Sequence, residues 1–442
     1  MDLVGIGTAD IRNYFCFLQN YTRCGNPTQI EQEEWMRLNP EYKSLPTIAE
    51  YRLPFLPKID IWKLITSELN LKTYEKWLTI ASILKLEPHI LCSVAIKEEV
   101  IQQWGPLNSI TKATEWSLYP KNNILLENVL KCIQRMTGRN ALYYATAALY
   151  CVVNYTPPGA DQVEAIRQCF TYAEKAVKQS TDFEEGLLEK IQFKYLRFTA
   201  EHILRSHSLG KDIYISLISN PSELVRTLYM DESIPLRYRS ALSLRPDINS
   251  AVDALGDLFS LNLIKLRLHL LREWLQPDSK YMKIDHSFCT DILSNFTHSD
   301  ISTNYDNNLC RACYVLQHGN VNLFIHFLIG IGFEKNTEED FCFEMRSRSL
   351  DVLQSIVDPK TLQELTKRDI STIRQYTKTL KYLSKLEALG LGYNIITFEA
   401  GSKYELVQML LNTQYYSPQA LILIVEICID YNINDYSIWD KS

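Results

Sequence analysis

The chain has 442 residues, of which 46% are hydrophobic and 22% are charged, a balance that is typical of a folded protein with a sizeable core. Its formal net charge is −6 and its isoelectric point is near 5.9, so composition gives no support for non-specific binding of nucleic acid. The length suits about two or three compact domains or one extended helical array.

Cysteine usage and the apolar runs limit the compartments in which the chain can work. The eleven cysteines are scattered and odd in number, which favours buried, reduced thiols in the cytosol or nucleus over a disulfide framework. The first residues, MDLVGIGTADIRNYF, lack the charged and apolar regions of a secretory signal. The longest apolar runs, Ala141–Val153 and Ala420–Val425, are too short to span a bilayer. We expect no disulfide and no membrane span.

Residues 1–52 are the least regular part of the chain, and we expect them to form a separate lead-in. Cys24-Gly25-Asn26-Pro27 is typical of a turn, and the text Gln29–Leu38 predicts one polar helix. From about residue 59 the pattern is almost wholly helical, with short breaks at Pro, Gly or Asn. The helices expected in the first half cover Ile61–Leu69, Lys72–Leu84, His89–Trp104, Leu107–Leu118, Ile124–Met136, Ala141–Val153, Gln162–Lys178 and Phe183–Ser206.

The clearest helix start in the sequence lies at Asn220-Pro221-Ser222-Glu223. We expect Asn220 to cap the free backbone donors, Pro221 to occupy the first turn and Glu223 to complete a capping box. Asp231–Pro235 should end this helix. Further on, a one-faced helix is predicted because apolar residues recur at i, i+4, i+7 and i+11 with charged residues between them. Its stripe is Ile264, Leu268, Leu271 and Leu275, and Lys265, Arg267, Arg272 and Glu273 fall outside it.

The last third of the chain begins with a break at Gln276–Ser279 and a polar, loop-rich passage through Asn295–Asn308. Asp358-Pro359 and Ser417-Pro418 repeat the combination of a capping residue and a proline. The final helix is apolar nearly all round, so it belongs inside the fold or under a partner. The expected helices are Leu309–Leu316, Val321–Ile331, Asp340–Val357, Pro359–Leu365, Ile370–Leu389, Tyr404–Leu411 and Gln419–Tyr431.

This series of helices predicts an all-α fold, an α-solenoid or irregular array of antiparallel helix pairs. Pairs recur at roughly 30–45 residues, as in helical repeats, but no repeated consensus is present. The predicted organisation is a lead-in over residues 1–52 and a helical array over residues 53–442. Subdivisions are expected near residues 156–159 and 276–308.

Candidate chemical residues are few, and the sequence favours structural roles for all of them. Cys310 and Cys313 form a CxxC without a second pair or suitably spaced histidines, so zinc or redox chemistry is not favoured. Asp285, His286 and Cys289 would point in different directions on a helix. His202 and His207, beside Glu201, lack the HExxH spacing and are expected to be surface or capping histidines.

The remaining motifs name no site. The Gly5/Gly7, Gly330/Gly332 and Gly390/Gly392 pairs lack the third glycine of a dinucleotide loop and indicate turns or helix ends. The 26 tyrosines and 7 tryptophans can serve core packing or anchor protein partners. Visible examples are Tyr143, Tyr144, Trp274, Tyr415, Tyr416 and Trp439. We therefore expect no catalytic, cofactor-binding or metal-binding residue and no enzyme activity, and no partner-binding residue can be assigned.

Five segments stand out for the order in which they follow one another. They are Leu53–Leu86, IYISLISNPSELVRTLYMDESI from Ile213, LFSLNLIKLRLHLLREWL from Leu258, LGYNIITFEAGSKYELVQMLLN from Leu391 and LILIVEICIDYNINDYSIWD from Leu421. In this order they resemble the C-terminal region of the Rough deal (Rod) family of kinetochore scaffolds. The resemblance covers residues 53–440 and rests on the order of these helical segments, because no active-site motif is among them. It implies a helical array similar to those of vesicle-tethering proteins.

The resemblance implies a non-catalytic subunit of the Rod–Zwilch–Zeste-white ten complex, at the outer kinetochore and spindle in mitosis and in the cytoplasm otherwise. It implies Zeste-white ten, Zwilch and a second Rod copy as partners, with Spindly and dynein recruited through the complex, and a role in corona assembly and spindle-checkpoint signalling. Direct nucleic-acid contact is not implied. The chain is far shorter than the family scaffold and lacks a β-propeller half, so the propeller's contact with Zwilch does not carry over. The alternative is a subunit of a Golgi-to-endoplasmic-reticulum vesicle-tethering complex.

Overall fold

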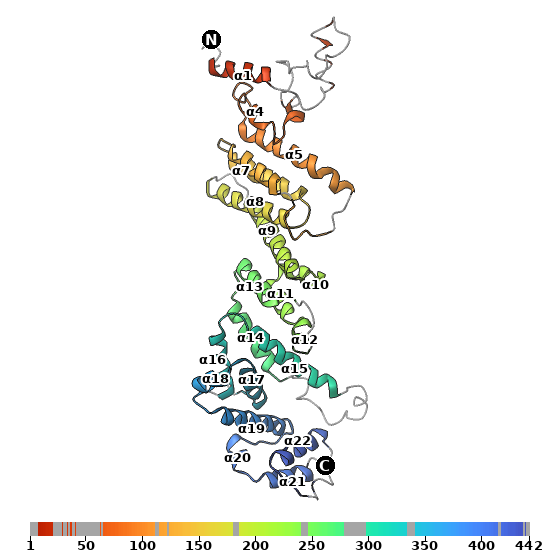
Figure 1. Ribbon diagram of the computed structural model, residues 1–442, viewed down its shortest axis with the longest axis vertical. Coiled ribbons are helices and arrows are strands. Elements are labelled where there is room, and N and C mark those ends of the chain that lie inside the picture. The colour runs from red at the N-terminus through yellow and green to blue at the C-terminus, as the bar shows by residue number, and fades with distance from the viewer. Residues whose placement is uncertain are drawn as a thin grey trace. The chain divides into compact units, whose positions relative to one another are not determined.

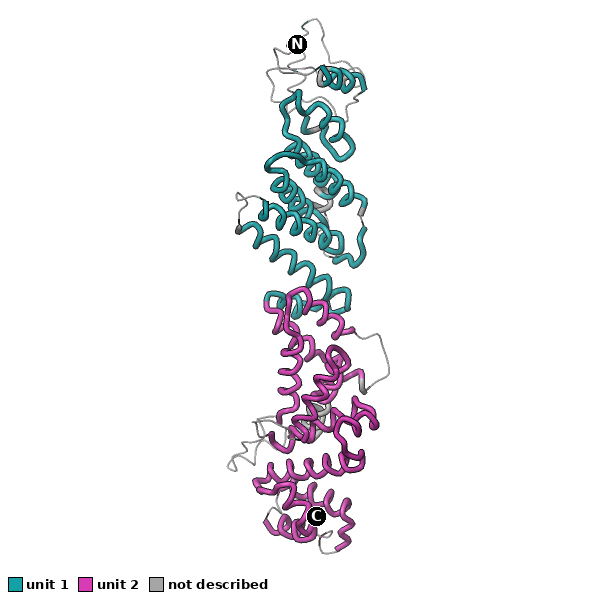
Figure 2. Tube along the Cα trace, turned by 90° about the vertical axis from the view of Figure 1, so that its left-hand side faces the viewer, with its two compact units in different colours: residues 1–219 teal, residues 220–442 magenta. Residues whose placement is uncertain are grey.

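The computed structural model shows a chain whose regular elements, in the part it describes, are all helices. The all-α prediction is therefore confirmed. The chain divides into two compact units, residues 1–219 and residues 220–442, coloured separately in Figure 2. Apart from a few isolated positions, the described residues are 8–20, 65–110, 115–121, 123–179, 185–239, 246–277, 298–333, 341–413 and 417–435. The boundary expected at residue 52 and the subdivisions near 156–159 and 276–308 stay predictions.

The first unit packs successive helices against one another. Helix α7 packs on both α5 and α8, and α8 packs in turn on α9 (Figure 1). Short connections such as residues 156–159 between α7 and α8 favour antiparallel neighbours. The described helices of this unit are α1 (Thr8–Asn20), η2 (Thr66–Glu68), α4 (Tyr74–Leu78), α5 (Pro88–Ile110), α6 (Asn123–Gln134), α7 (Ala141–Tyr155), α8 (Ala160–Gln179), α9 (Glu185–Ser206), α10 (Asp212–Ser216) and η3 (Leu217–Ser219).

One continuous apolar core holds the first unit together. Leu91 and Ile96 of α5, Leu149 of α7, Ile166 of α8 and Ile191 of α9 are fully buried in it. Burying side chains of this size contributes roughly 1.5–3 kcal/mol each. The core thus explains why helices with poor caps remain in place.

The helix expected over Leu107–Leu118 is wrong. Helix α5 continues through Gly105-Pro106 to Ile110, and residues 115–118 of the predicted helix are not helical. Ser117 donates its backbone N–H to the Pro158 carbonyl and accepts from the Ala160 N–H, at 3.1 and 2.8 Å. These bonds to the α7–α8 connection satisfy the backbone of this segment without a helix.

The second unit is also built from helices that pack on one another. Helix α17 packs on α16 and α19, and α21 packs on α22 (Figure 1). Its helices are α11 (Pro221–Tyr229), α12 (Ser233–Arg239), α13 (Ile248–Phe259), α14 (Leu263–Leu275), α15 (His298–Val315), α16 (Val321–Phe333), α17 (Phe343–Ile356), α18 (Pro359–Thr366), α19 (Ile370–Ala388), α20 (Ile395–Ala400), α21 (Lys403–Thr413) and α22 (Pro418–Asp430).

Four helices of this unit differ from the sequence-based expectations. Helix α15 begins at His298, inside the passage expected to be loop-rich. Helices α12, α13 and α20 are not among the expected helices, and α12 begins inside the break expected at Asp231–Pro235. Helix propensity is a weak prior that tertiary packing overrides. The described buried residues of α15 lie near its C-terminal end and are Ala312, Cys313, Tyr314 and Val315.

Helix caps confirm some of the predicted starts and correct one. Asp358 accepts from the backbone N–H groups of Lys360 and Thr361, and Ser417 accepts from that of Ala420, as expected. Asn220 occupies the N-cap of α11, but its side chain makes no capping hydrogen bond. Pro221 does occupy the first turn, so the position of this helix start is right although its predicted cap is wrong.

The apolar stripe predicted for α14 is also displaced from the buried face. Ile264 is 42% exposed, whereas Arg267, placed outside the stripe, is only 3% exposed. The buried face consists of Arg267, Leu270, Leu271, Trp274 and Leu275. The helix has one buried face as predicted, but this face is rotated relative to the predicted stripe. The rotation is possible because the buried Arg267 donates hydrogen bonds to Tyr229 and Asp253.

The last helix, α22, buries only part of its apolar surface. Leu423, Ile424, Ile427 and Cys428 lie in a core with residues of α19, α20 and α21, whereas Ile429 is 62% exposed. The placement of this helix inside the fold is thus confirmed for one face. Within the described part of the chain, no helix has both the length and the apolar character that crossing a membrane requires.

Candidate functional site

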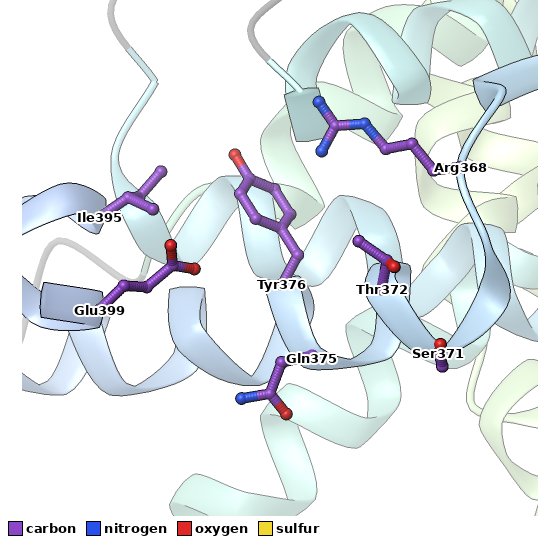
Figure 3. Close-up of a pocket in the computed structure, with 7 residues that line it drawn as sticks. All are labelled: Arg368, Ser371, Thr372, Gln375, Tyr376, Ile395 and Glu399. Atoms are coloured by element: carbon purple, nitrogen blue, oxygen red, sulfur yellow. The ribbon is translucent and has the colours of Figure 1, made fainter.

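Helices α19 and α20 of the second unit line an open hollow of about 650 Å³ (Figure 3). This volume is within the range of roughly 300–1,000 Å³ that is usual for ligand pockets. The α18–α19 connection contributes one residue, α19 four and α20 two. The lining residues are Arg368, Ser371, Thr372, Gln375, Tyr376, Ile395 and Glu399.

Helical spacing explains why these side chains face the same space. The four α19 residues stand at i, i+1, i+4 and i+5, which share one face of a helix. Ile395 and Glu399 stand at i and i+4 on α20. Both helices have firmly capped starts: Asp369 accepts from the Ser371 N–H, and Asn394 forms a capping box with Thr397. The caps therefore fix the two walls of the hollow.

Arg368 is held against two aromatic rings at one side of the hollow. Its guanidinium carbon lies 4.7 Å from the centre of the Phe333 ring and 5.6 Å from that of Tyr376. The two rings stack with their centres 5.5 Å apart. Cation–π contacts of this kind contribute roughly 0.5–1 kcal/mol at exposed sites. The stacking orients the guanidinium, and Arg368 has no ion-pair partner within the described part of the chain.

The buried side chain of Arg346 holds Tyr376 in place, because its Nη2 donates a hydrogen bond to the Tyr376 hydroxyl. Figure 3 shows Tyr376 between the guanidinium of Arg368 and the carboxylate of Glu399. The ring is half-buried and presents an apolar surface between two charged groups. The hollow thus has an anchored centre and charged sides.

Glu399 lies at the opposite side of the hollow and forms no ion pair with any described residue. The cation Lys403 interacts electrostatically with Glu399, and its Nζ donates to the Gly401 carbonyl at 3.0 Å and also to the Phe398 carbonyl. Burial lowers the pKa of Lys403, and the negative charge of Glu399 offsets part of that lowering. Lys403 is therefore engaged by backbone carbonyls, and the Glu399 carboxylate keeps its acceptor sites for a ligand.

The histidines singled out in the sequence are not brought together with other metal-ligating groups. Trp116 donates from its indole Nε1 to Nδ1 of His202 at 3.3 Å, and burial lowers the pKa of His202. Glu201 pairs instead with Arg205, whose guanidinium carbon lies 5.3 Å from the centre of the Trp116 ring. The expectation of a surface or capping role is thus wrong for His202, because this side chain joins α9 to the segment around Trp116.

His207 follows the end of α9 and agrees better with the capping interpretation. Its Nδ1 lies 2.9 Å from the carbonyl oxygen of Ile203. A contact of this kind satisfies one of the free carbonyls at a helix C-terminus. His207 therefore has a local structural role.

The CxxC sequence lies near the C-terminal end of α15. Cys313 is buried, and burial together with the neighbouring Cys310 raises its pKa to about 11. A thiol with so high a pKa carries little of the thiolate that redox chemistry needs at neutral pH. Asp285, His286 and Cys289 lie outside the described residues. Among those that are described, no group of three or more His, Cys, Asp and Glu side chains is placed to hold a metal ion.

Among the described residues, the glycine pairs and the aromatic residues named above occupy structural positions. Gly330 and Gly332 lie in the last turns of α16, and Gly390 and Gly392 follow α19, as expected of helix ends. Trp274 is buried, whereas Tyr143 is 46% exposed and meets Tyr144 edge-on. Gly5, Gly7, Tyr415, Tyr416 and Trp439 lie outside the described residues.

Sequence reasoning missed both the hollow and the buried position of Arg267. Arg267 stands three, four and seven residues before Leu270, Leu271 and Trp274, so a stripe centred on those residues would have found it. Arg368 and Glu399 gave no comparable signal, because an exposed charge in a helical sequence is normally a solvated surface group.

Comparison with known proteins gives a consistent result over nearly the whole chain. Residues 43–441 match the family described as the Rough deal protein C-terminal region. The chain is 23% identical to human Kinetochore-associated protein 1 over 440 residues, which cover 96% of the chain and 19% of that protein. It is 22% identical to the mouse protein of the same name over 445 residues, or 97% of the chain and 19% of the relative.

The chain thus spans about a fifth of the length of the curated relatives it matches. The family match includes the α19–α20 hollow and every described helix of the two compact units except α1. It also includes the segments on which the sequence resemblance rests. Because the match extends over most of its length, the chain belongs to the family of Rough deal protein C-terminal regions.

Proposed function

We propose that this chain is a non-catalytic scaffold segment of a kinetochore complex of the Rod–Zwilch–Zeste-white ten type. The observation that carries the proposal is the family match over residues 43–441, which covers every described helix except α1. The relatives it resembles are named as kinetochore-associated proteins. The helical fold supports a scaffold role because each unit displays surface on mutually packed helices.

The polar groups inside the second unit also support a non-catalytic role. Arg267, Tyr229 and Asn249 are buried and hydrogen-bonded to one another or to neighbouring helices, so they hold the helices together. Cys313 is buried, and His202 and His207 make structural hydrogen-bond contacts within the first unit. The α19–α20 hollow offers charged and hydroxyl groups for binding.

The proposed partners follow from family membership. They are Zeste-white ten, Zwilch and a second Rod copy, with Spindly and dynein recruited through the assembled complex. The scaffold would support outer-corona assembly and spindle-checkpoint signalling at the outer kinetochore and spindle in mitosis, and would be cytoplasmic otherwise. The acidic net charge of −6 supports contact with proteins rather than nucleic acid.

Affinity purification of the tagged chain from mitotic extract, followed by mass spectrometry, tests these partners. We expect recovery of Zeste-white ten and Zwilch together with endogenous Rod. A tag-only purification from the same extract provides the background. Recovery of Golgi-to-endoplasmic-reticulum tethers without Zwilch would contradict the proposal and favour a vesicle-tethering role.

A further inference from the structure

The hollow between α19 and α20 carries two opposite charges without an ion-pair partner among the described residues. Arg368 supplies the positive charge and Glu399 the negative charge, from opposite sides of Tyr376 (Figure 3). We propose that the hollow binds a short peptide segment of another protein that carries one acidic and one basic side chain. The proposal thus gives the scaffold a class of partner. It rests on the proposed scaffold function in one respect, namely that the ligand is a protein.

Arg368 is suited to receive the acidic side chain. Its contacts with Phe333 and Tyr376 hold the guanidinium in place before a ligand arrives, so less side-chain entropy is lost on binding. A planar guanidinium can bind a carboxylate through two parallel hydrogen bonds. The side chain as a whole remains exposed, so a ligand can reach it.

Glu399 is suited to receive the basic side chain. It is exposed on α20, and its neighbour Lys403 is already bound to the carbonyls of Phe398 and Gly401. A lysine or arginine of the ligand would therefore find carboxylate oxygens that no described side chain occupies. Figure 3 shows the carboxylate directed toward the same space as the Tyr376 ring.

The groups between the two charges match the rest of a peptide. Ser371 and Thr372 offer hydroxyl groups that can bond to backbone amides, although Ser371 also donates to Asp369. Tyr376 and Ile395 are half-buried and offer apolar surface to a side chain between the charged ones. The hollow thus has complementary surface for the middle of the segment as well as for its charged groups.

The same charges make a simple ion a poor ligand. A phosphate or other anion at Arg368 would be repelled by Glu399, and a lone cation at Glu399 would be repelled by Arg368. Five of the seven lining residues, all but Tyr376 and Ile395, are exposed, so the hollow is too open to enclose a small molecule. A peptide with both charges satisfies both sides at once and can extend along the open surface.

The test selects a phage-displayed library of random linear peptides on the full 442-residue chain. Counter-selection uses the Arg368→Glu/Glu399→Lys double variant. Enriched peptides are synthesised with a fluorescent label, and their affinities are measured by fluorescence anisotropy. Matched control variants are Arg374→Glu on α19 and Glu364→Lys on α18, since both residues are exposed and outside the hollow. Circular dichroism checks that every variant keeps its helical content.

We expect the enriched peptides to carry both an acidic and a basic residue. Arg368→Glu and Glu399→Lys should each weaken binding about tenfold or more, and the two control variants should leave it within about twofold. A peptide with its two charges exchanged should bind the double variant better than the wild type. The proposal is overturned if no peptide is enriched over the double variant, if enriched peptides carry one sign of charge only, or if all variants bind alike. None of these results depends on kinetochore localisation, so failure here leaves the scaffold proposal standing.

Discussion

Arg267 of α14 donates a hydrogen bond from Nε to the hydroxyl of Tyr229 on α11, with 2.9 Å between the two atoms. Its Nη2 also donates to Asp253 on α13 at 2.6 Å, and the Tyr229 hydroxyl donates to Asn249 at 3.0 Å. Burial raises the pKa of Tyr229, which keeps this hydroxyl protonated and able to donate. A single buried arginine therefore joins three helices of the second unit.

Replacing this arginine should destabilise the second unit. We expect Arg267→Met to lower the free energy of unfolding by about 2 kcal/mol, because Tyr229 loses a partner in a buried site. Asp253 is 41% exposed at its side chain, so water can replace its lost partner and the cost stays below that of a fully buried pair. Urea unfolding followed by circular dichroism measures the change. Lys265→Met, on the exposed side of the same helix, should have little effect, and equal effects of the two changes would contradict this account.

Two asparagines at helix starts provide a matched comparison of capping. Asn262 accepts from the Lys265 backbone N–H at 3.0 Å, whereas Asn220 makes no side-chain capping bond. We expect Asn262→Ala to cost about 1 kcal/mol of stability and Asn220→Ala to cost clearly less. The same urea experiment measures both. A larger loss at Asn220 would show that this side chain caps α11 in solution.

Gly159 allows the close approach of the α7–α8 connection to the segment around Ser117. Its φ is +142°, and an added Cβ would lie 2.4 Å from the Ser117 carbonyl oxygen. We expect Gly159→Ala to destabilise the first unit by about 2 kcal/mol, because L-residues rarely adopt this φ and the backbone would have to move. Thermal unfolding followed by circular dichroism checks the effect.

Gly186 provides the matched control for this change. It is the second residue of α9, and nothing approaches an added Cβ within 4 Å. We expect Gly186→Ala to leave the melting temperature unchanged or raise it, since alanine is a better helix former than glycine. If both alanine variants melt at the wild-type temperature, the close contact at Ser117 does not exist in solution.

The contact between Trp116 and His202 should depend on pH. The indole N–H donates to His202 Nδ1, which can accept only while the ring is neutral. Because burial lowers the pKa of His202 below its usual value near 6.5, this contribution to stability is complete above that value. It is lost as the pH falls through the lower pKa of the folded state.

A histidine titration followed by NMR measures this pKa directly. We expect the His202 ring to titrate below its usual value, and His202→Gln to reduce the fall in melting temperature between neutral and mildly acidic pH. Glutamine keeps an acceptor but does not titrate. A ring that titrates at or above its usual value would contradict the buried, neutral histidine.

The fold class was predictable because apolar periodicity and proline or asparagine breaks reflect local physics. Asp358-Pro359 and Ser417-Pro418, for example, specify the starts of α18 and α22 within a few residues of chain. The errors arose where distant groups decide the outcome. Ser117 leaves the predicted helix because its backbone bonds to the α7–α8 connection, and Arg267 is buried because Tyr229 and Asp253 lie nearby.

The α19–α20 hollow could not be predicted either, because it also depends on groups that are distant in the sequence. Phe333, Arg368 and Glu399 belong to three different elements, and the sequence does not show that the guanidinium stacks on one ring while the carboxylate lies across Tyr376. Surface charges on helices are so common that single ones carry no information. The family resemblance named a class of scaffold but did not point to these residues.

The localisation of the fluorescently tagged chain through the cell cycle tests the central claim most directly. The scaffold proposal predicts enrichment at kinetochores in mitosis and a diffuse cytoplasmic signal in interphase. A matched control is the Arg267→Met variant, which should lose this enrichment in proportion to its loss of folded protein. Enrichment at the endoplasmic reticulum in interphase without a kinetochore signal in mitosis would contradict the account and favour vesicle tethering.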